Sequence, residues 1–164
     1  MTTDSAAPPP KSLPQLAGEL LPGSSGAAAA ELARVEARLG CPLHDDHRQL
    51  LTLANGGAPK RACYRHDGVS IFLQYIWGIE APSGPSEEEL EGLESRLLIW
   101  SAPAGPRQLV PVARGGQDDE LSISLVDGSV HYLESSDPYR EPFEQSRLLE
   151  DSLAALLGKL DEQF

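Results

Sequence analysis

Cysteine, aromatic residues and long apolar runs are all scarce in this chain of 164 residues. Its two cysteines, Cys41 and Cys63, form no CxxC pair and are too few for a disulfide framework, so we expect free thiols. No apolar run approaches the roughly 18 residues that a membrane-spanning helix needs. The first residues also lack the basic stretch followed by an apolar one that marks a secretory signal. These absences predict a soluble cytoplasmic protein with no membrane partner.

The motifs of common enzyme classes are absent as well. Neither GxxxxGK[ST] nor GxGxxG occurs, and GxSxG is also missing. Ser122, Ser124 and Ser129 lie in strand or turn patterns with no helix start behind them, unlike a nucleophile elbow. A thiolate pair of Cys63 and His66 would need the fold to bring both together with an orienting third group. We therefore expect no enzyme, no cofactor and no resident metal, and a small metal-dependent hydrolase is the remotest alternative.

Negative charge is plentiful and unevenly distributed. The chain carries 25 acidic and 13 basic side chains, a formal net charge of −12. Residues 1–66 have a net charge of +1, whereas residues 67–164 have a net charge of −13. Such a field repels nucleic acid and favours encounter with a basic protein surface. The alternative is that the acidity serves solubility alone.

The first part of the chain has the pattern of a tail followed by three amphipathic helices. Residues 1–11 are small, polar and rich in proline, which predicts a disordered tail before a single domain over residues 12–164. Gly40 stands where a left-handed helix end is expected, and Asn55-Gly56-Gly57 stops the third helix. The apolar stripes of the three helices are Leu13, Leu16, Leu20 and Leu21; Ala28, Leu32, Val35 and Leu39; and Leu43, His47, Leu50, Leu51 and Ala54.

A polar cluster opens the third helix. Asp45 and Asp46 fall at its amino end, where carboxylates accept backbone N–H groups and complement the helix dipole. His47 lies on the apolar stripe and His44 on a neighbouring face, which is not the HExxH spacing of a zinc protease. A zinc site of Cys41, His44 and His47 stays open, although it lacks a fourth ligand at a recognisable spacing.

The second part of the chain is typical of strands with one helical insertion. Strands are expected over residues 69–80, 108–116 and 119–125, with Asp127-Gly128 as a two-residue hairpin turn before a returning strand at 130–133. An acidic helix begins after Ser86, and a terminal helix is expected within residues 146–164. The order predicts an α+β fold with a mostly antiparallel sheet of about four to six strands flanked by helices.

Five short motifs together resemble a known family. The first runs from Leu39 to Gly57 and contains Leu-Gly, two later leucine positions and the Asn-Gly-Gly stop. The others are Trp77-Gly78, Val110-Pro111-Val112-Ala113, Gly128-Ser129-Val130-His131-Tyr132 and Asp151-Ser152-Leu153. In this order and spacing they resemble the SUKH superfamily, which includes fungal Smi/Knr cell-wall regulators and many bacterial immunity proteins, over about residues 26–160.

The resemblance implies an antiparallel sheet flanked by helices, with no catalytic residue set. It also implies a protein-binding module, most often a bacterial immunity protein that occludes a toxin domain, commonly a nuclease. A regulatory or scaffold module that binds an endogenous protein is the alternative. His44 stands where the family usually has proline, His47 where it has an aromatic residue, and Leu153 where phenylalanine is common. Because His47 occupies a packing position, we expect a core histidine with a hydrogen-bonded ring nitrogen.

The acidic second part supplies the candidate contacts to a basic toxin domain. Acidic side chains would face the cations of the partner, and aromatic side chains would anchor the interface if they are exposed. The candidates are Glu87, Glu88, Glu89, Asp118, Asp119, Glu120, Glu134, Asp137, Trp77, Trp100 and Tyr132. Glu87 to Glu89 could equally form a solvated helix start. Residues 118–120 could form a simple loop or, as a minor alternative, bind calcium.

Overall fold

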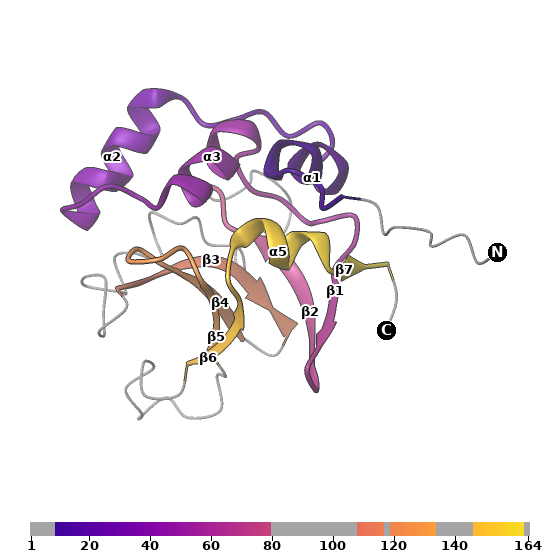
Figure 1. Ribbon diagram of the computed structural model, residues 1–164. Helices are drawn as coiled ribbons and strands as arrows, with labels where there is room; N and C mark the ends of the chain where they lie inside the picture. Colours follow the sequence, from indigo (N-terminus) through magenta and orange to yellow (C-terminus); the bar gives the residue numbers. More distant parts are fainter. Residues whose placement is uncertain (1–8, 80–107, 117–118, 134–145, 163–164) are drawn as a thin grey trace.

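The computed structural model describes residues 9–79, 108–116, 119–133 and 146–162, and all statements of structure below concern these ranges (Figure 1). Their helices are α1 (Leu13–Leu20), α2 (Ala29–Leu39), α3 (Asp45–Leu53) and α5 (Leu153–Gly158). Their strands are β1 (Cys63–His66), β2 (Val69–Ile76), β3 (Leu109–Gly115), β4 (Glu120–Ser124), β5 (Val130–Leu133), β6 (Arg147–Glu150) and β7 (Leu160–Asp161). The α+β prediction is confirmed, with seven strands instead of four to six. The expected acidic helix after Ser86 lies outside the described residues.

The three amino-terminal helices form where their apolar stripes predict them. The backbone N–H of Ser12 donates to Gln15 at the start of α1, and that of Ala28 donates to Glu31 at the start of α2. Gly40 ends α2 in the left-handed conformation, with φ of 73°. Each helix buries its leucines against the others, since α1 packs on α3 and α5, and α3 packs on α2.

The start of α3 differs from the prediction. The first residue of the helix is Asp45, and the residue that caps it is His44, whose Nδ1 accepts a hydrogen bond from the Asp46 N–H at 3.3 Å. The two aspartates lie in the first turn instead, where their charge complements the helix dipole. An imidazole nitrogen therefore takes the role that we assigned to a carboxylate.

The strands form one antiparallel sheet in the order β6-β5-β4-β3-β2-β1-β7. In β2, Ile71, Leu73 and Tyr75 are buried and the residues between them are exposed, as the alternation predicts. Strand β5 has the predicted bounds. The turn before it is longer than two residues, because the Ser124 N–H donates to the Ser129 carbonyl and the Ser124 carbonyl accepts from the Gly128 N–H.

Strand β1 was missed although its signal was present. Asp67 and Gly68 have φ of 47° and 75° and join β1 to β2 as a two-residue turn. Such a turn needs positive φ at both positions, which Asp-Gly adopts at low cost. The same dipeptide at Asp127-Gly128 was taken as a hairpin signal, so the chemistry that identifies β1 was available in the sequence.

The prediction of one terminal helix over residues 146–164 is wrong. The leucine spacing fits a helix, but this stretch forms β6, the short helix α5 and the two-residue strand β7. The Ser152 side chain accepts a hydrogen bond from the Ala155 N–H at 3.1 Å, so Ser152 starts a new helix in an extended conformation. Residues before it are free to pair with β5, and residues after Gly158 pair with β1.

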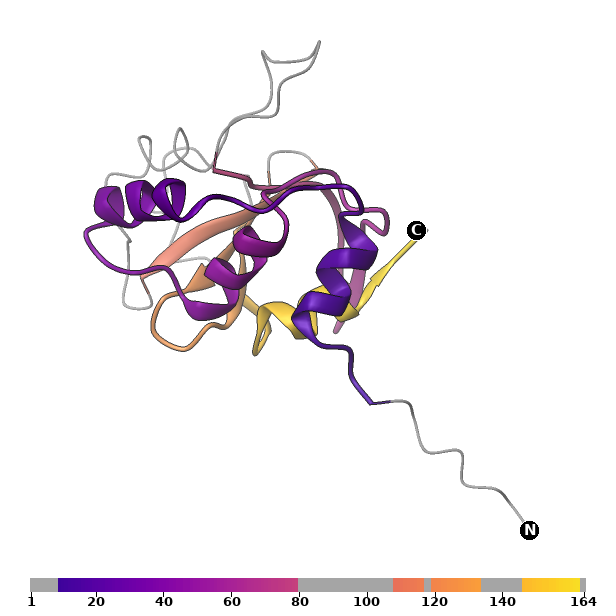
Figure 2. The ribbon, with the colours of Figure 1, turned by 90° about the horizontal axis from the view of Figure 1, so that it is seen from above.

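The sheet curls, and the helices lie on one side of it (Figures 1 and 2). Strands β1 and β6 are far apart in the sheet order, yet the Tyr64 hydroxyl donates to Glu150 Oε1 at 2.8 Å. Lys159 Nζ reaches the same oxygen at 2.6 Å. We call Tyr64, Glu150 and Lys159 the tyrosine closure. Burial and the Glu150 carboxylate raise the pKa of the Tyr64 hydroxyl, so its proton stays in place.

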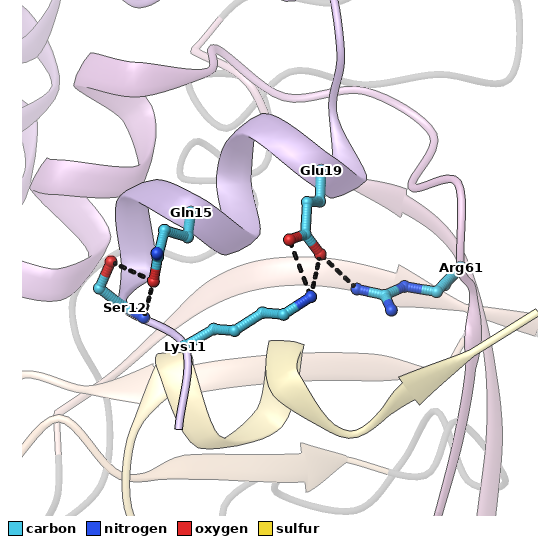
Figure 3. A network of polar contacts seen from close by, with 5 residues as sticks. All are labelled: Lys11, Ser12, Gln15, Glu19 and Arg61. Carbon is cyan, nitrogen blue, oxygen red and sulfur yellow. Dashed lines mark hydrogen bonds and ion pairs between the residues drawn. The ribbon is translucent and has the colours of Figure 1, made fainter. Parts of the chain in front are cut away.

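Helix α1 is also attached at its exposed side by charged groups (Figure 3). The Glu19 carboxylate accepts hydrogen bonds from Lys11 at 2.6 Å and from Arg61 at 3.2 Å, which links α1 to the segment before β1.

No helix within the described ranges combines the length and apolarity that crossing a membrane requires.

Candidate functional site

The family-like motifs meet in space. The segment Asn55–Gly57 that stops α3 lies beside residues 76–79 at the end of β2. Gly57 and Ile76 exchange two backbone hydrogen bonds, of 3.0 Å and 2.9 Å. The Asn55 side chain accepts a third from the Ile79 N–H at 2.8 Å. We call residues 55–57 and 76–79 the glycine junction.

The backbone segments of the glycine junction lie so close together that two of its positions can only be glycine. A Cβ on Gly56 would overlap the backbone of Gly78, and a Cβ on Gly78 would overlap the carbonyl oxygen of Asn55. Gly56 also has φ of 78°, where side chains are strained. The Trp77 N–H donates to the Val112 carbonyl at 3.0 Å, which adds a third motif to the contact. The motifs therefore position the chain where it leaves β2, and they offer no reacting group.

A second meeting of motifs involves His44 and Gly128. Besides capping α3, the His44 ring lies against Gly128 in the turn between β4 and β5, so that a Cβ on Gly128 would overlap the ring. The imidazole thus fills the space between helix and hairpin at a position where the family usually has proline. His44 acts as a packing and capping group.

His47 is buried, but its expected hydrogen bond is absent. The side chain is 0% exposed, and among the described residues neither ring nitrogen has a hydrogen-bond partner. The prediction of a core histidine is confirmed, and the prediction of a hydrogen-bonded ring nitrogen is wrong. Burial, and then the charge of His44, lower the pKa of His47 to about 4, so the ring is neutral at pH 7.

The remaining chemical alternatives find no assembled site in the described ranges. No three side chains among the His, Cys, Asp and Glu residues described are placed to share a metal ion, and Cys41 lies near the Leu39 carbonyl instead. Cys63 and His66 are three positions apart on β1 and therefore point to opposite faces of the sheet. His66 contacts Asp67 at 3.4 Å.

One serine does lie between an aspartate and a histidine. Ser129 Oγ is 2.5 Å from Asp127 Oδ1 and 2.9 Å from His131 Nε2. A hydroxyl has one proton, and the shorter bond to the carboxylate uses it, so His131 Nε2 donates to Ser129. In a nucleophile pair the histidine accepts that proton. These hydrogen bonds therefore stabilise the hairpin between β4 and β5, and they do not activate the serine.

The structure describes four of the candidate partner contacts. Asp119 is half-buried beside the turn that leads into β4, and Tyr132 is half-buried against the core. Glu120 is 5% exposed and Trp77 is 3% exposed. The candidates outside the described residues are Glu87, Glu88, Glu89, Trp100, Asp118, Glu134 and Asp137.

Two of the predicted contacts need correction. Glu120 is a buried member of β4 opposite Arg114, and it accepts a hydrogen bond from Ser122, so it is not a surface charge. Trp77 was offered as an anchor if exposed, and its place in the glycine junction buries it. Every residue of β4, which carries Glu120, is buried, so both faces of this strand are covered, which alternation alone did not reveal.

The described strands that precede the remaining acidic candidates end at opposite sides of the sheet. Because β3, β4 and β5 are antiparallel neighbours, Asp119 and the carboxyl end of β5 lie at the same end. The carboxyl end of β2 lies at the other end. In the sequence, Glu134 follows directly after β5, and Glu87 to Glu89 come after Ile79.

Comparison with known proteins agrees with the motifs. The sequence model of the SMI1 / KNR4 family (SUKH-1) matches residues 26–159. No curated protein matches the chain. The match covers well over half of the 164 residues and includes both groups of motifs that meet in the fold. The chain belongs to the SMI1 / KNR4 family (SUKH-1).

Proposed function

We propose that this chain is an immunity protein: a protein-binding module without catalysis that docks an acidic surface over a basic toxin domain, such as a nuclease. Membership of the SMI1 / KNR4 family is consistent with an immunity or regulatory protein-binding module. The observation that carries the finer proposal is the net charge of −13 over residues 67–164. We propose further that residues 12–164 form the binding domain, behind a tail of residues 1–11, and that it acts in the cytoplasm.

The negative charge of residues 67–164 is complementary to the basic surface of a nuclease. A toxin that cleaves nucleic acid presents cations to phosphate groups, and carboxylates can occupy the same cations. Long-range attraction also speeds encounter, so this mode of binding is fast at low salt and slower at high salt. Binding would therefore occlude the toxin by covering its basic surface, with no chemical step.

The proposed docking surface is the end of the sheet that carries Asp118 and Asp119. Asp119 is held at this end by the β3-β4 hairpin, in which the Gly115 N–H donates to the Asp119 carbonyl at 2.7 Å. Glu134 and Asp137 come after β5 in the sequence and are the other acidic residues proposed for this surface, with Tyr132 and Trp100 as the proposed aromatic anchors. Glu87 to Glu89 come after β2 in the sequence, and we propose them as a separate candidate surface. Glu120 and Trp77 are left out because they are buried.

The first test is genetic. A gene adjacent to the one that encodes this chain should encode the toxin, and co-expression should restore growth of cells that make it. If the neighbour is a toxin and co-expression does not restore growth, the immunity proposal is wrong and the regulatory alternative is favoured.

The second test measures binding to that toxin domain with matched charge changes. Replacing Asp118→Asn and Asp119→Asn removes two charges at the proposed surface, and we expect about tenfold weaker binding, mainly through slower association. Asp161→Asn with Glu162→Gln removes two exposed charges beside β7 and is the control. If both double variants weaken binding equally, the net charge of the chain matters and the surface at Asp118 and Asp119 does not bind the toxin. If binding weakens only when Glu87 to Glu89 are neutralised, those three residues form the docking surface instead.

A further inference from the structure

His47 is an ionisable group that the proposed function does not use. It lies in the first turn of α3, fully buried, and neither ring nitrogen has a hydrogen-bond partner within the part of the chain that the structure describes. An aromatic or aliphatic side chain would fill the same space without leaving two polar nitrogens unpaired. A buried imidazole of this kind is stable only while it is neutral.

On the described helices that pack against α3, the carboxylates are engaged with other partners. On α1, the one ionisable side chain is Glu19, which lies outside and binds Lys11 and Arg61. Helix α5 has no ionisable side chain. The charged groups of α2 are Glu31, which accepts from the Ala28 N–H, Glu36, which binds Arg48, and Arg34 and Arg38, which have partners of their own.

The surroundings on α3 itself also oppose a positive charge. His44 lies three residues before His47, and its charge acts in the same direction as burial. The free N–H groups of the first helical turn carry partial positive charge, which disfavours a cation there. Asp45 is exposed and Asp46 is half-buried, and both precede His47 by less than one turn, on other faces of the helix.

The position of His47 couples its charge to the helical layer. The inner stripe of α3 consists of His47, Leu50 and Leu51, all essentially inaccessible to water, and α3 packs on α1, α2 and α5. An imidazolium can reach water only if this stripe leaves its neighbours. Protonation of His47 therefore opposes the docking of α3.

We propose that His47 is an acid-sensitive latch: when it takes up a proton, α3 separates from α1 and α5, and the helical layer opens while the sheet persists. A histidine in an open or unfolded chain binds a proton near pH 6.5, whereas the docked His47 does so only near pH 4. Between these values the open state holds one more proton, so docking weakens as the pH falls below about 6.5. The opening constant should rise by up to about tenfold per pH unit, and by about 70-fold in total between pH 7.5 and pH 4.5.

The test is amide hydrogen exchange of the full chain between pH 7.5 and 4.5, corrected for the intrinsic pH dependence of exchange. We expect the amides of α3 to lose protection in the native sequence relative to His47→Phe, and the gap between them to widen below pH 6.5. His47→Leu repeats the comparison if phenylalanine does not fit. Equal pH dependence of the native chain and either folded variant would overturn the proposal.

Two further variants separate His47 from other histidines. His66→Asn removes an exposed histidine and should leave the pH dependence unchanged. His44→Asn keeps a side-chain acceptor for the Asp46 N–H and should retain most of the pH dependence. If His44→Asn abolishes the pH dependence of α3 exchange, His44 at the cap of α3 senses the pH and His47 does not. If the β4 and β5 amides open together with α3, the transition is global unfolding and the latch is excluded.

Discussion

The glycine junction and the tyrosine closure both join segments that are distant in the sequence, and they do so by different chemistry. In the junction, backbone meets backbone at Gly56 and Gly78. In the closure, long side chains bridge β1 and β6 through Tyr64 and Glu150. Backbone contact admits only glycine, whereas a side-chain bridge could be built from many residue pairs. The first kind of joint leaves a motif in the sequence, and the second leaves none.

The largest effect is expected when a methyl group is placed in the glycine junction, where backbone contacts backbone. Gly56→Ala combines positive φ with overlap against Gly78, so we expect a loss of about 4 kcal/mol or more, measured by urea unfolding. Gly23→Ala is the matched control, because Gly23 has φ of 80° and no atom within 4 Å of the added carbon. It should cost about 1 kcal/mol. Similar losses in both would mean that close approach contributes nothing.

Gly128→Ala tests a contact that is half backbone and half side chain. The added carbon would overlap the His44 ring, which can turn away, so we expect a loss of about 2–3 kcal/mol in urea unfolding. Combining it with His44→Ala should cost less than the sum of the two single changes, since the overlap is then relieved. Additive losses would show that φ of 74° at Gly128 accounts for the whole effect.

Tyr64→Phe tests the closure. It removes a buried hydrogen bond to a carboxylate that keeps Lys159 as a partner, so we expect a loss of about 1.5–2 kcal/mol at pH 7. The pKa of Tyr64 is raised in the folded chain, so the native protein should lose further stability above about pH 10, and Tyr64→Phe should lose less there. Urea unfolding at pH 7 and pH 10.5 measures both. If Tyr64→Phe is as stable as the native chain, the tyrosine closure does not stabilise the fold.

Glu19→Gln should give the smallest effect, because its partners are exposed. The hydrogen bond from Lys11 is the main cause that lowers the pKa of Glu19, so its contribution is present at neutral pH and is lost as the carboxylate is protonated in acid. We expect a small decrease in melting temperature at low salt that disappears at 1 M salt. A decrease that persists in high salt would show packing by the side chain instead.

The same contrast explains what the sequence could and could not predict. Helices α1 to α3 and strands β2 to β5 follow from leucine spacing, alternation and glycine punctuation, and the family follows from the glycine motifs. Strand β7 has two residues and β6 has four, which is too short for a periodic signal unless a turn motif stands beside the strand, as Asp127-Gly128 does before β5. The leucines from Leu149 to Leu160 fit a single helix equally well. Nothing local to His47 shows whether a polar partner lies opposite it, so the missing hydrogen bond was not predictable.

The stretch from β6 to β7 has a consequence for how the chain is made. Residues 147–161 supply one edge strand beside β5 and the other edge strand beside β1, with Cys63 opposite Asp161. Until this stretch leaves the ribosome, β5 and β1 stand as unprotected edges, which invite pairing with other nascent chains. Folding of the sheet is therefore completed only after residues 147–161 have been synthesised. Changes that delay α5 should lower the yield of soluble protein even where they leave the stability of the finished fold intact.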